Sequence, residues 1–197
     1  MNLENIQDIE KLVLSADDIA ETLSIRKKSA QVTASRYASS GKLIRLKRDT
    51  YILPQRLKTL TEKELFTLAT YLQPQSYISL TTALSFYELT TQQQRNFIES
   101  VALKRTTTFQ VRDIEFTFTK VKKEFYSGFK RKDEFFIALP EKALADVIYL
   151  TSIGNYKADF DAIDFSKFNK KEVEQILSKS NKAAVNLWQK LIKNYAI

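Results

Sequence analysis

The chain has 197 residues, of which 44% are hydrophobic and 27% charged, enough for one or two globular domains. It contains no His, no Cys and only three Gly, which excludes Ser-His-Asp and Cys-His triads, ordinary zinc sites and Gly-rich phosphate loops. Lys and Arg outnumber Asp and Glu by 31 to 23, giving a formal charge of +8 that favours a polyanionic partner.

The amino-terminal residues and the lengths of the apolar segments indicate the cellular compartment in which the protein is expected. The amino terminus is acidic and discontinuous in its apolar residues, which is not typical of a signal peptide. No segment approaches the roughly 18 apolar residues of a membrane span. The lack of Cys suits a reducing compartment. We therefore expect a cytoplasmic protein with no membrane contact. Because the chain lacks the His, Cys and Gly-rich segments of common catalytic and metal sites, we also expect no metal, no cofactor and no enzymatic activity.

The charge is unevenly distributed along the chain. Residues 1–21 hold six acidic residues and one basic residue, whereas residues 22–48 hold eight basic residues and no acidic one. An ordinary solvated surface mixes both signs, so residues 22–48 predict a surface for a polyanion. A second, weaker basic region spans residues 104–132.

Three helices are expected in the first part of the chain. Apolar residues at helical spacing predict the first helix over residues 2–13. Ser15 and Asp18 have the spacing of an approximate capping box, which predicts a short second helix. A third helix is expected over residues 28–40, because Gly41 is suited to the left-handed conformation that follows a helix end.

The outer face of the third helix combines short polar and basic residues. Hydroxyls and cations reach phosphates, Gln31 can pair with adenine, and Val32 can touch a thymine methyl. A plain solvated face has the same residue types, so this helix alone leaves both interpretations open. The candidate DNA-binding residues on this helix are Lys28, Ser29, Gln31, Val32, Ser35 and Arg36.

A basic hairpin is expected directly after this helix. Strand-like residues 42–46 and 50–53 surround the turn 47–49, and their apolar side chains can cover the helices while the cations face phosphates. A basic hairpin beside a basic helix predicts a winged helix-turn-helix, which we assign to residues 1–58. Its further candidate DNA-binding residues are Lys42, Arg45, Lys47 and Arg48.

Residues 59–197 predict a C-terminal domain of mixed α/β structure. Thr61 and Glu64 form a capping box, and Pro140 suits the first position of a later helix. The expected fold class is therefore α+β, an N-terminal winged helix-turn-helix followed by this second domain. Helices are expected over residues 61–72, 80–87, 141–150, 170–178 and 181–195, and strands over 97–102, 114–121 and 135–139.

Three segments carry a family resemblance. They read Gly41-Lys-Leu-Ile-Arg-Leu-Lys-Arg-Asp-Thr-Tyr51, Tyr77-Ile-Ser-Leu-Thr-Thr-Ala-Leu-Ser-Phe-Tyr-Glu-Leu89 and Ala138-Leu-Pro-Glu-Lys-Ala-Leu-Ala-Asp146. In this order they resemble segments of the AbiEi-type antitoxins, the regulators of type IV toxin–antitoxin systems. The chain departs from the family at Asp49, where Gly is usual at the hairpin tip.

The resemblance implies a transcriptional repressor that binds promoter inverted repeats in double-stranded DNA and autoregulates its operon. It also implies an antitoxin of abortive infection, an antiviral defence, whose C-terminal domain neutralises a nucleotidyltransferase toxin without a stable complex. Two half-sites would be bound by a dimer or by two cooperating monomers. The recurring polar residues Glu141, Lys142 and Asp146 are candidates for an antitoxic surface, whereas a helix cap with a salt bridge is the favoured interpretation.

Two other functions with candidate residues remain open from the sequence, beside a protein-interaction module with an incidental basic surface. Phe109, Phe116 and Phe118, with the cations of residues 104–132, would suit RNA binding, although alternation along residues 114–119 also fits a buried core. Asp159 and Asp161 would share one face of a strand near Asp164 and could hold Mg²⁺ for nucleotidyl transfer. Turn or helix-capping roles are the favoured interpretation of these three carboxylates.

Overall fold

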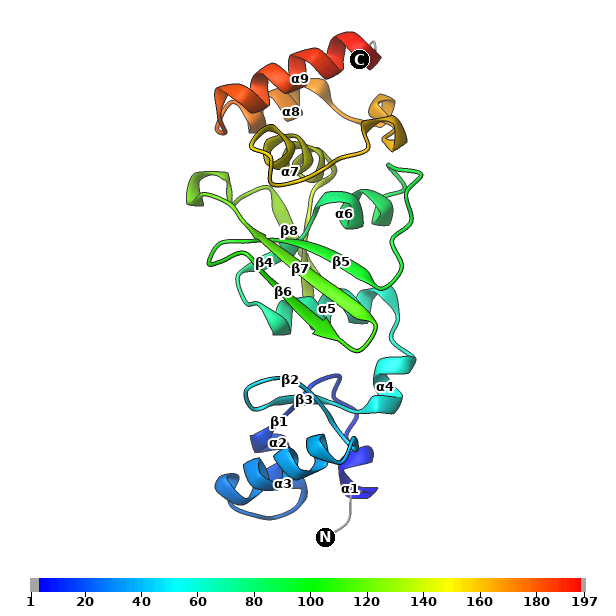
Figure 1. Ribbon diagram of the computed structural model, residues 1–197, viewed down its shortest axis with the longest axis vertical. Coiled ribbons are helices and arrows are strands. Elements are labelled where there is room, and N and C mark those ends of the chain that lie inside the picture. The colour runs from blue at the N-terminus through cyan, green and yellow to red at the C-terminus, as the bar shows by residue number, and fades with distance from the viewer. Residues whose placement is uncertain (1–3, 196–197) are drawn as a thin grey trace. The chain divides into compact units, whose positions relative to one another are not determined.

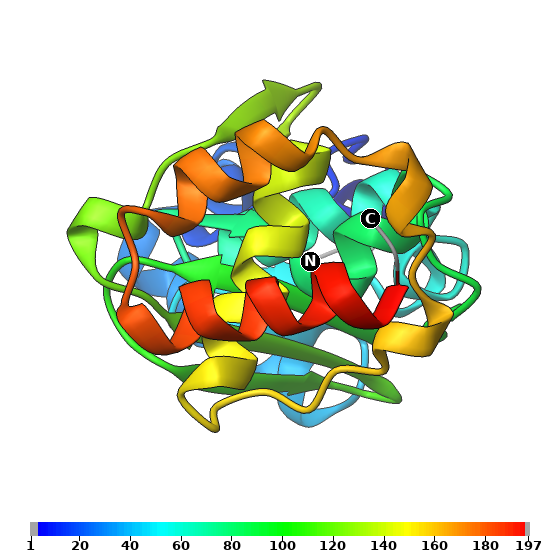
Figure 2. The same ribbon diagram turned by 90° about the horizontal axis from the view of Figure 1, so that it is seen from above.

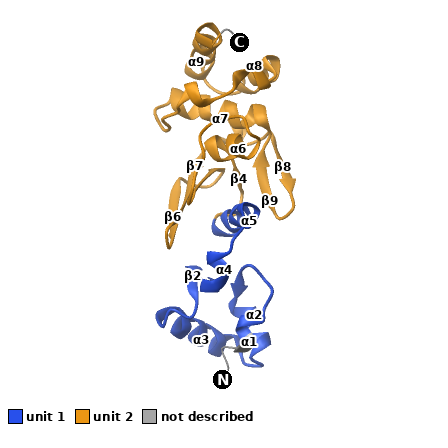
Figure 3. Ribbon diagram, turned by 90° about the vertical axis from the view of Figure 1, so that its right-hand side faces the viewer, with its two compact units in different colours: residues 1–72 blue, residues 73–197 orange. Residues whose placement is uncertain are grey.

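The computed structural model describes residues 4–195, and the chain divides into two compact units, residues 1–72 and 73–197 (Figure 3). Helices and strands contribute to both units, so the fold class is α+β, as expected. The boundary follows Leu72, whereas the sequence placed it after Lys58. The helix that ends at Leu72 belongs to the first unit. A hydrogen bond from Lys47 to the Tyr71 carbonyl connects this helix to the rest of that unit.

Unit 1, residues 1–72, combines short helices with a small sheet (Figure 1). The sheet has the order β1-β3-β2, and both pairings are antiparallel. The elements described in this unit are α1 (Glu4–Gln7), β1 (Leu14–Ser15), α2 (Ala16–Thr22), α3 (Lys27–Ser39), β2 (Ile44–Lys47), β3 (Thr50–Ile52), α4 (Pro54–Lys58) and α5 (Glu62–Leu72).

Local sequence signals explain where α2 and α3 lie. The Ser15 hydroxyl accepts a hydrogen bond from the Asp18 amide, and the Asp18 carboxylate accepts one from the Ser15 amide, so the capping box is complete. Gly41 follows α3 with a φ of 74°, the left-handed conformation that favours glycine. The chain continues after the hairpin as α4, because Pro54 occupies the first turn of this helix, where no amide hydrogen is needed.

The first helix is shorter than the expected range of residues 2–13. Within the described residues α1 ends at Gln7, while residues 2 and 3 lie outside them. Leu14 pairs in β1 opposite Tyr51 of β3, so the chain has to leave the helix to reach the sheet. The expectation was wrong because local periodicity does not reveal this pairing.

Unit 2, residues 73–197, is built on a six-stranded sheet of order β6-β7-β5-β4-β9-β8. The β5–β7 and β4–β9 pairs are parallel and the others antiparallel. The described elements are β4 (Ser76–Ile78), α6 (Leu80–Phe86), β5 (Phe97–Ala102), β6 (Thr107–Val111), β7 (Ile114–Lys120), η1 (Lys123–Phe125), β8 (Phe129–Lys132), β9 (Phe135–Ala138), α7 (Pro140–Ser152), η2 (Phe160–Ala162), η3 (Phe165–Lys167), α8 (Lys170–Leu177) and α9 (Lys182–Tyr195).

The helices of unit 2 form layers above the sheet. Helices α6 and α7 lie next to the sheet, and α8 and α9 pack on α7 (Figures 1 and 2). Because α7 has neighbours on both sides, every residue from Lys142 to Leu150 is buried. In the part of the chain that the structure describes, no helix is both long and apolar enough to cross a membrane.

Candidate nucleic-acid interface

Helix α3 has a buried face and an exposed face. Ala30, Thr33 and Ala34 are buried, and their spacing of three and four residues places them on one side of the helix. The other side carries the residues that the sequence predicted to contact DNA. Exposed on this side are Lys28, Ser29, Val32, Ser35 and Arg36, whereas Gln31 is half-buried.

A single hydrophobic cluster holds α3 against the sheet. Ala30 and Ala34 of α3 belong to it, as do Ile19 of α2 and Tyr51 of β3. The small side chains on α3 allow close approach of these elements, since alanine extends only one carbon from the backbone. The cluster therefore fixes the direction in which the exposed face of α3 points.

The β2–β3 hairpin combines a buried apolar side with an exposed basic side. Leu43, Leu46 and Tyr51 are buried, whereas Arg45 and Arg48 are exposed. The Arg48 side chain is 90% exposed and lies at the turn, with its Nε 3.9 Å from the neighbouring Asp49 carboxylate. Such a long exposed cation is suited to a backbone phosphate.

Several cations of this surface have no carboxylate partner. Among the described residues, no salt bridge involves Lys28, Arg36, Lys42 or Arg45, although Lys42 Nζ lies 5.5 Å from the centre of the Tyr37 ring. Lys27 differs, because its ammonium lies 2.7 Å from the Asp17 carboxylate. Unpaired exposed cations produce a positive potential that attracts a polyanion.

Lys47 is half-exposed and its ammonium is engaged, whereas the sequence predicted a lysine that faces outward toward phosphates. The register of β2 against β3 shifts between Arg45 and Lys47, and such an irregularity changes the direction of the side chain that follows it. Lys47 Nζ donates a hydrogen bond of 2.5 Å to the carbonyl of Tyr71, near the end of α5. Burial lowers the pKa of Lys47. This lysine therefore attaches α5 to the hairpin, and its ammonium is already engaged.

Asp49 belongs to this surface although the sequence did not predict it. Its φ of 53° places it in the left-handed region, which Asp tolerates better than most residues. Its Oδ2 accepts a hydrogen bond of 3.2 Å from Nε2 of Gln31, so the hairpin tip contacts the exposed side of α3. Its position in the turn was visible in the sequence, but its contact across 18 residues of chain was not.

The three candidate antitoxic residues have different environments. Lys142 and Asp146 are fully buried, and their charged atoms are 2.6 Å apart. Tyr77 and Ser79 also donate hydrogen bonds to the Asp146 carboxylate, of 3.0 and 2.7 Å. Only Glu141 is partly accessible, and it accepts a bond of 3.3 Å from the Asn169 amide. Lys142 and Asp146 thus form an internal ion pair and no contact surface.

The electrostatics of this pair are dominated by burial. Burial lowers the pKa of Lys142 and raises the pKa of Asp146, while the opposite charge of each partner counteracts both shifts. The Lys142 ammonium also lies 3.5 Å from the centre of the Phe125 ring, a cation–π contact.

A second buried carboxylate, Glu99 of β5, was not predicted from the sequence. It is 4% exposed and accepts hydrogen bonds from Gln94 and Tyr156, of 2.9 and 3.2 Å. Burial raises the pKa of Glu99, and no described Lys or Arg lies within salt-bridge distance. A glutamate inside a strand of otherwise apolar and small residues was the only available signal.

The aromatic residues proposed for RNA binding are mostly internal. Phe116 and Phe118 are 0% and 1% exposed, and Phe109 packs edge-on against Phe118 with ring centres 5.8 Å apart. Because bases stack only on accessible rings, β7 offers no such platform. The cations of the 104–132 region lie on the surface, but no exposed aromatic platform on β7 accompanies them.

The three aspartates considered for Mg²⁺ have structural partners. Asp164 caps η3 by accepting from the Ser166 amide, Asp159 accepts from Gln92, and Asp161 accepts from the Tyr195 hydroxyl. Among the described residues, no group of three or more carboxylates could hold a metal ion. Asp164 thus has the capping role favoured from the sequence, whereas the side chains of Asp159 and Asp161 bond to residues distant in the chain.

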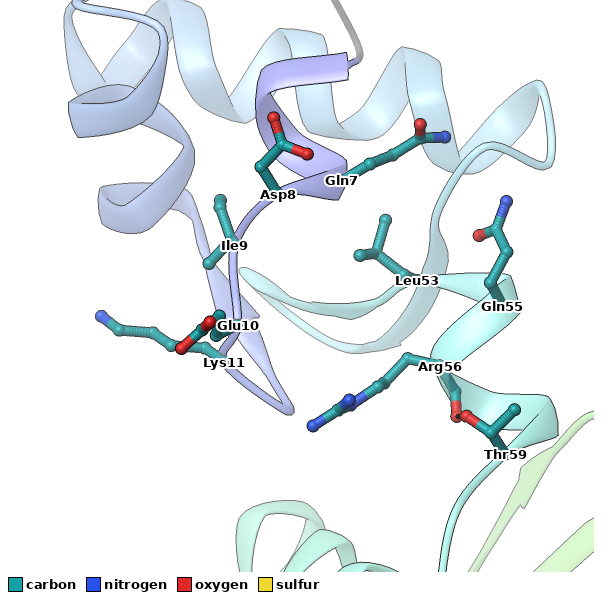
Figure 4. Close-up of a pocket in the computed structure, with 9 residues that line it drawn as sticks. All are labelled: Gln7, Asp8, Ile9, Glu10, Lys11, Leu53, Gln55, Arg56 and Thr59. Atoms are coloured by element: carbon teal, nitrogen blue, oxygen red, sulfur yellow. Dashed lines mark hydrogen bonds between the residues drawn. The ribbon is translucent and has the colours of Figure 1, made fainter.

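A pocket of about 380 Å³ lies elsewhere in unit 1, between the segment after α1 and α4 (Figure 4). Its lining balances Asp8 and Glu10 against Lys11 and Arg56. Both cations already have partners, because Lys11 pairs with Asp18 and Arg56 Nη2 lies 3.3 Å from Glu64. The pocket therefore has no charge that would select a ligand.

Comparison with known proteins gives a likeness of fold. No protein-family model and no curated protein matches the chain. The chain is similar to the crystal structure of the RV2827C protein from Mycobacterium tuberculosis, with a TM-score of 0.63 over 97% of this chain and 74% of that chain. The sequence identity is 11%, so the likeness concerns the fold alone, an α+β arrangement that recurs in that protein.

Proposed function

We propose that this chain is a sequence-specific DNA-binding protein whose first unit contains a winged helix-turn-helix. The observation that carries the proposal is the exposed face of α3 and the β2–β3 hairpin, which the Gln31–Asp49 hydrogen bond joins and on which exposed cations lie beside short polar side chains. The order of elements supports it, because α2 and α3 pack on a three-stranded antiparallel sheet with the hairpin after α3.

The chemistry of the surface suggests how DNA would be bound. Helix α3 would enter the major groove with Gln31 and Val32 toward base edges, since an amide can pair with adenine and a methyl can touch thymine. Arg45 and Arg48 of the hairpin, with Lys42 before it, would contact phosphates. Lys47 is left out of this set because Tyr71 engages its ammonium.

The family resemblance extends the proposal to a biological role. The chain would bind inverted repeats in the promoter of its own operon and repress it. It would also act as the antitoxin of a type IV system, with unit 2 neutralising a nucleotidyltransferase toxin without a stable complex. The buried Lys142–Asp146 pair would serve this role only by maintaining the fold of unit 2.

The test is fluorescence anisotropy with duplex DNA from upstream of the chain's own gene, beside a scrambled duplex of equal composition. We expect selective binding to the native duplex that weakens with salt. Arg36→Ala should lower that affinity about tenfold or more. The matched control is Lys190→Ala, which removes one exposed cation from α9 and should bind as the wild type does.

Two results would contradict the proposal. Equal affinity for the native and scrambled duplexes would leave only a nonspecific basic surface. Equal losses in Arg36→Ala and Lys190→Ala would show that the surface of α3 has no special part in binding.

A further inference from the structure

The tip of the basic hairpin carries a carboxylate at a position where a phosphate would approach. Asp49 is part of the turn between β2 and β3, and its side chain is 37% exposed. A negative charge there weakens binding to every duplex, whatever the sequence. The contact of Asp49 with α3 has a different effect from its charge. This contact involves a single side chain of α3, Gln31, and therefore bears on the recognition of one base pair.

The Asp49 carboxylate determines which end of the Gln31 amide faces it. A carboxylate only accepts hydrogen bonds, so it must face the NH₂ group of Gln31 and not the carbonyl oxygen. The Oδ2–Nε2 distance of 3.2 Å fits this arrangement. One amide hydrogen is thereby used, whereas the second hydrogen and the carbonyl oxygen of Gln31 stay available.

The remaining groups of Gln31 match one base. Adenine presents an acceptor, N7, and a donor, its N6 amino group, in the major groove, and a glutamine amide contacts both at once. This bidentate contact needs one amide hydrogen and the carbonyl oxygen, which are the groups that Asp49 leaves available. An amide held in one orientation also loses less side-chain entropy when it binds.

We propose that Asp49 is a positioning residue for base recognition, which orients Gln31 from the hairpin tip toward an adenine in the major groove. The inference rests on the proposed DNA-binding function and names a specificity determinant within that surface. Asp49 itself touches no base. Its removal should therefore change discrimination at one base pair, while the loss of its charge changes affinity for all duplexes alike.

The test compares three variants on a panel of duplexes in which each A·T pair of the native site is replaced in turn. Gln31→Ala identifies the base pair that Gln31 reads, as the one at which discrimination falls about tenfold. Asp49→Gly should lose discrimination at the same pair, and glycine accepts the φ of 53° without strain. Asp49→Asn also tolerates this conformation and keeps a side-chain oxygen that can accept from Gln31.

Asp49→Asn and Asp49→Gly both remove the negative charge, so we expect both to bind all duplexes more tightly. Because the Asn amide can also donate to the Gln31 carbonyl oxygen, Asp49→Asn should retain only part of the discrimination at the Gln31 pair, and Asp49→Gly less than Asp49→Asn. Wild-type discrimination in Asp49→Gly, with loss in Gln31→Ala, would overturn the positioning role and leave DNA binding intact. Unchanged discrimination in Gln31→Ala would overturn it as well. A wild type that binds native and scrambled duplexes equally would overturn the proposed function itself.

Discussion

Lys47 and Arg48 are adjacent cations with different environments. The Lys47 ammonium is bound to the Tyr71 carbonyl, whereas the Arg48 side chain is 90% exposed. Arg48→Ala should therefore weaken DNA binding and reduce the slope of log affinity against log salt by about 0.9, the value for one lost phosphate contact. Lys47→Ala should leave that slope nearly unchanged. Anisotropy titrations over a salt series measure both effects.

The same pair of variants differs in stability. Lys47→Ala leaves the Tyr71 carbonyl without its partner and should lower the free energy of unfolding by about 1 kcal/mol. Arg48→Ala should change it by less than about 0.5 kcal/mol, as expected for an exposed side chain. If Lys47→Ala reduced the salt slope as strongly as Arg48→Ala, the assignment of Lys47 to a structural contact would be wrong.

Glu99 makes the stability of unit 2 depend on pH. Burial raises its pKa above the ordinary value of a glutamate, so the folded chain keeps this proton at a pH where the unfolded chain has lost it. The stabilisation is complete below the ordinary pKa and is lost as the pH rises through the raised pKa. Glu99→Gln removes this titration and should reduce the decline in unfolding free energy over that window by on the order of 1 kcal/mol.

Urea denaturation from about pH 4 to pH 8 measures the decline. Glu62→Gln is the control for the loss of an exposed carboxylate, because Glu62 lies on the surface of α5, and the decline should be smaller in Glu99→Gln than in this control. Identical profiles for wild type and Glu99→Gln would contradict the raised pKa.

At the residue scale, periodicity predicted which side of α3 is exposed, because small residues recur at its buried positions. The engaged state of Lys47 and the contact of Asp49 with Gln31 could not be predicted. The partners lie 24 and 18 residues apart in the chain, and a strand irregularity redirects Lys47. Such contacts arise from tertiary structure and leave no local pattern in the sequence.

At the scale of elements, helices and strands with strong local sequence signals were predicted correctly, whereas those with weak signals were missed. Capping boxes located α2 and α5, and alternation located β7. Strand β8 was missed because Phe129–Lys132 reads as a run of charge, which suits an edge strand that must avoid further pairing. Strand β6 was missed because its residues alternate only between half-buried and exposed before Val111.

Helix α7 depends on the ion pair that it carries in its first two turns. Lys142→Met would leave the Asp146 carboxylate buried without a cation, and we expect a loss of about 3–5 kcal/mol in unfolding free energy. Lys142→Met with Asp146→Asn should recover much of this loss, since the amide oxygen of Asn still accepts hydrogen bonds from Tyr77 and Ser79. Chemical denaturation measures all three proteins.

Lys182→Met provides the control for this series, because Lys182 is an exposed cation at the start of α9. It should change stability by less than about 0.5 kcal/mol. A double variant less stable than Lys142→Met would contradict the interpretation that the uncompensated carboxylate causes the loss.

At the scale of the whole molecule, the sequence predicted an α+β chain, and the structure agrees. It did not predict that the helix ending at Leu72 groups with the first unit, because this depends on tertiary contacts such as that of Lys47. The two basic regions, residues 22–48 and 104–132, fall in different units. The salt dependence of DNA binding can determine whether both of them contact DNA.

The proposed interface provides five exposed cations, Lys28, Arg36, Lys42, Arg45 and Arg48. If each contacts one phosphate, the slope of log affinity against log salt should be about −4.5 per bound chain, because each contact contributes about −0.9. Neutralising Lys122 and Lys123 together, two exposed cations of the second region, should then leave the slope unchanged. A wild-type slope much steeper than this value, reduced in the Lys122→Ala/Lys123→Ala variant, would mean that unit 2 also binds the DNA backbone. Since that outcome leaves base discrimination through α3 intact, the salt series separates the extent of the interface from its specificity.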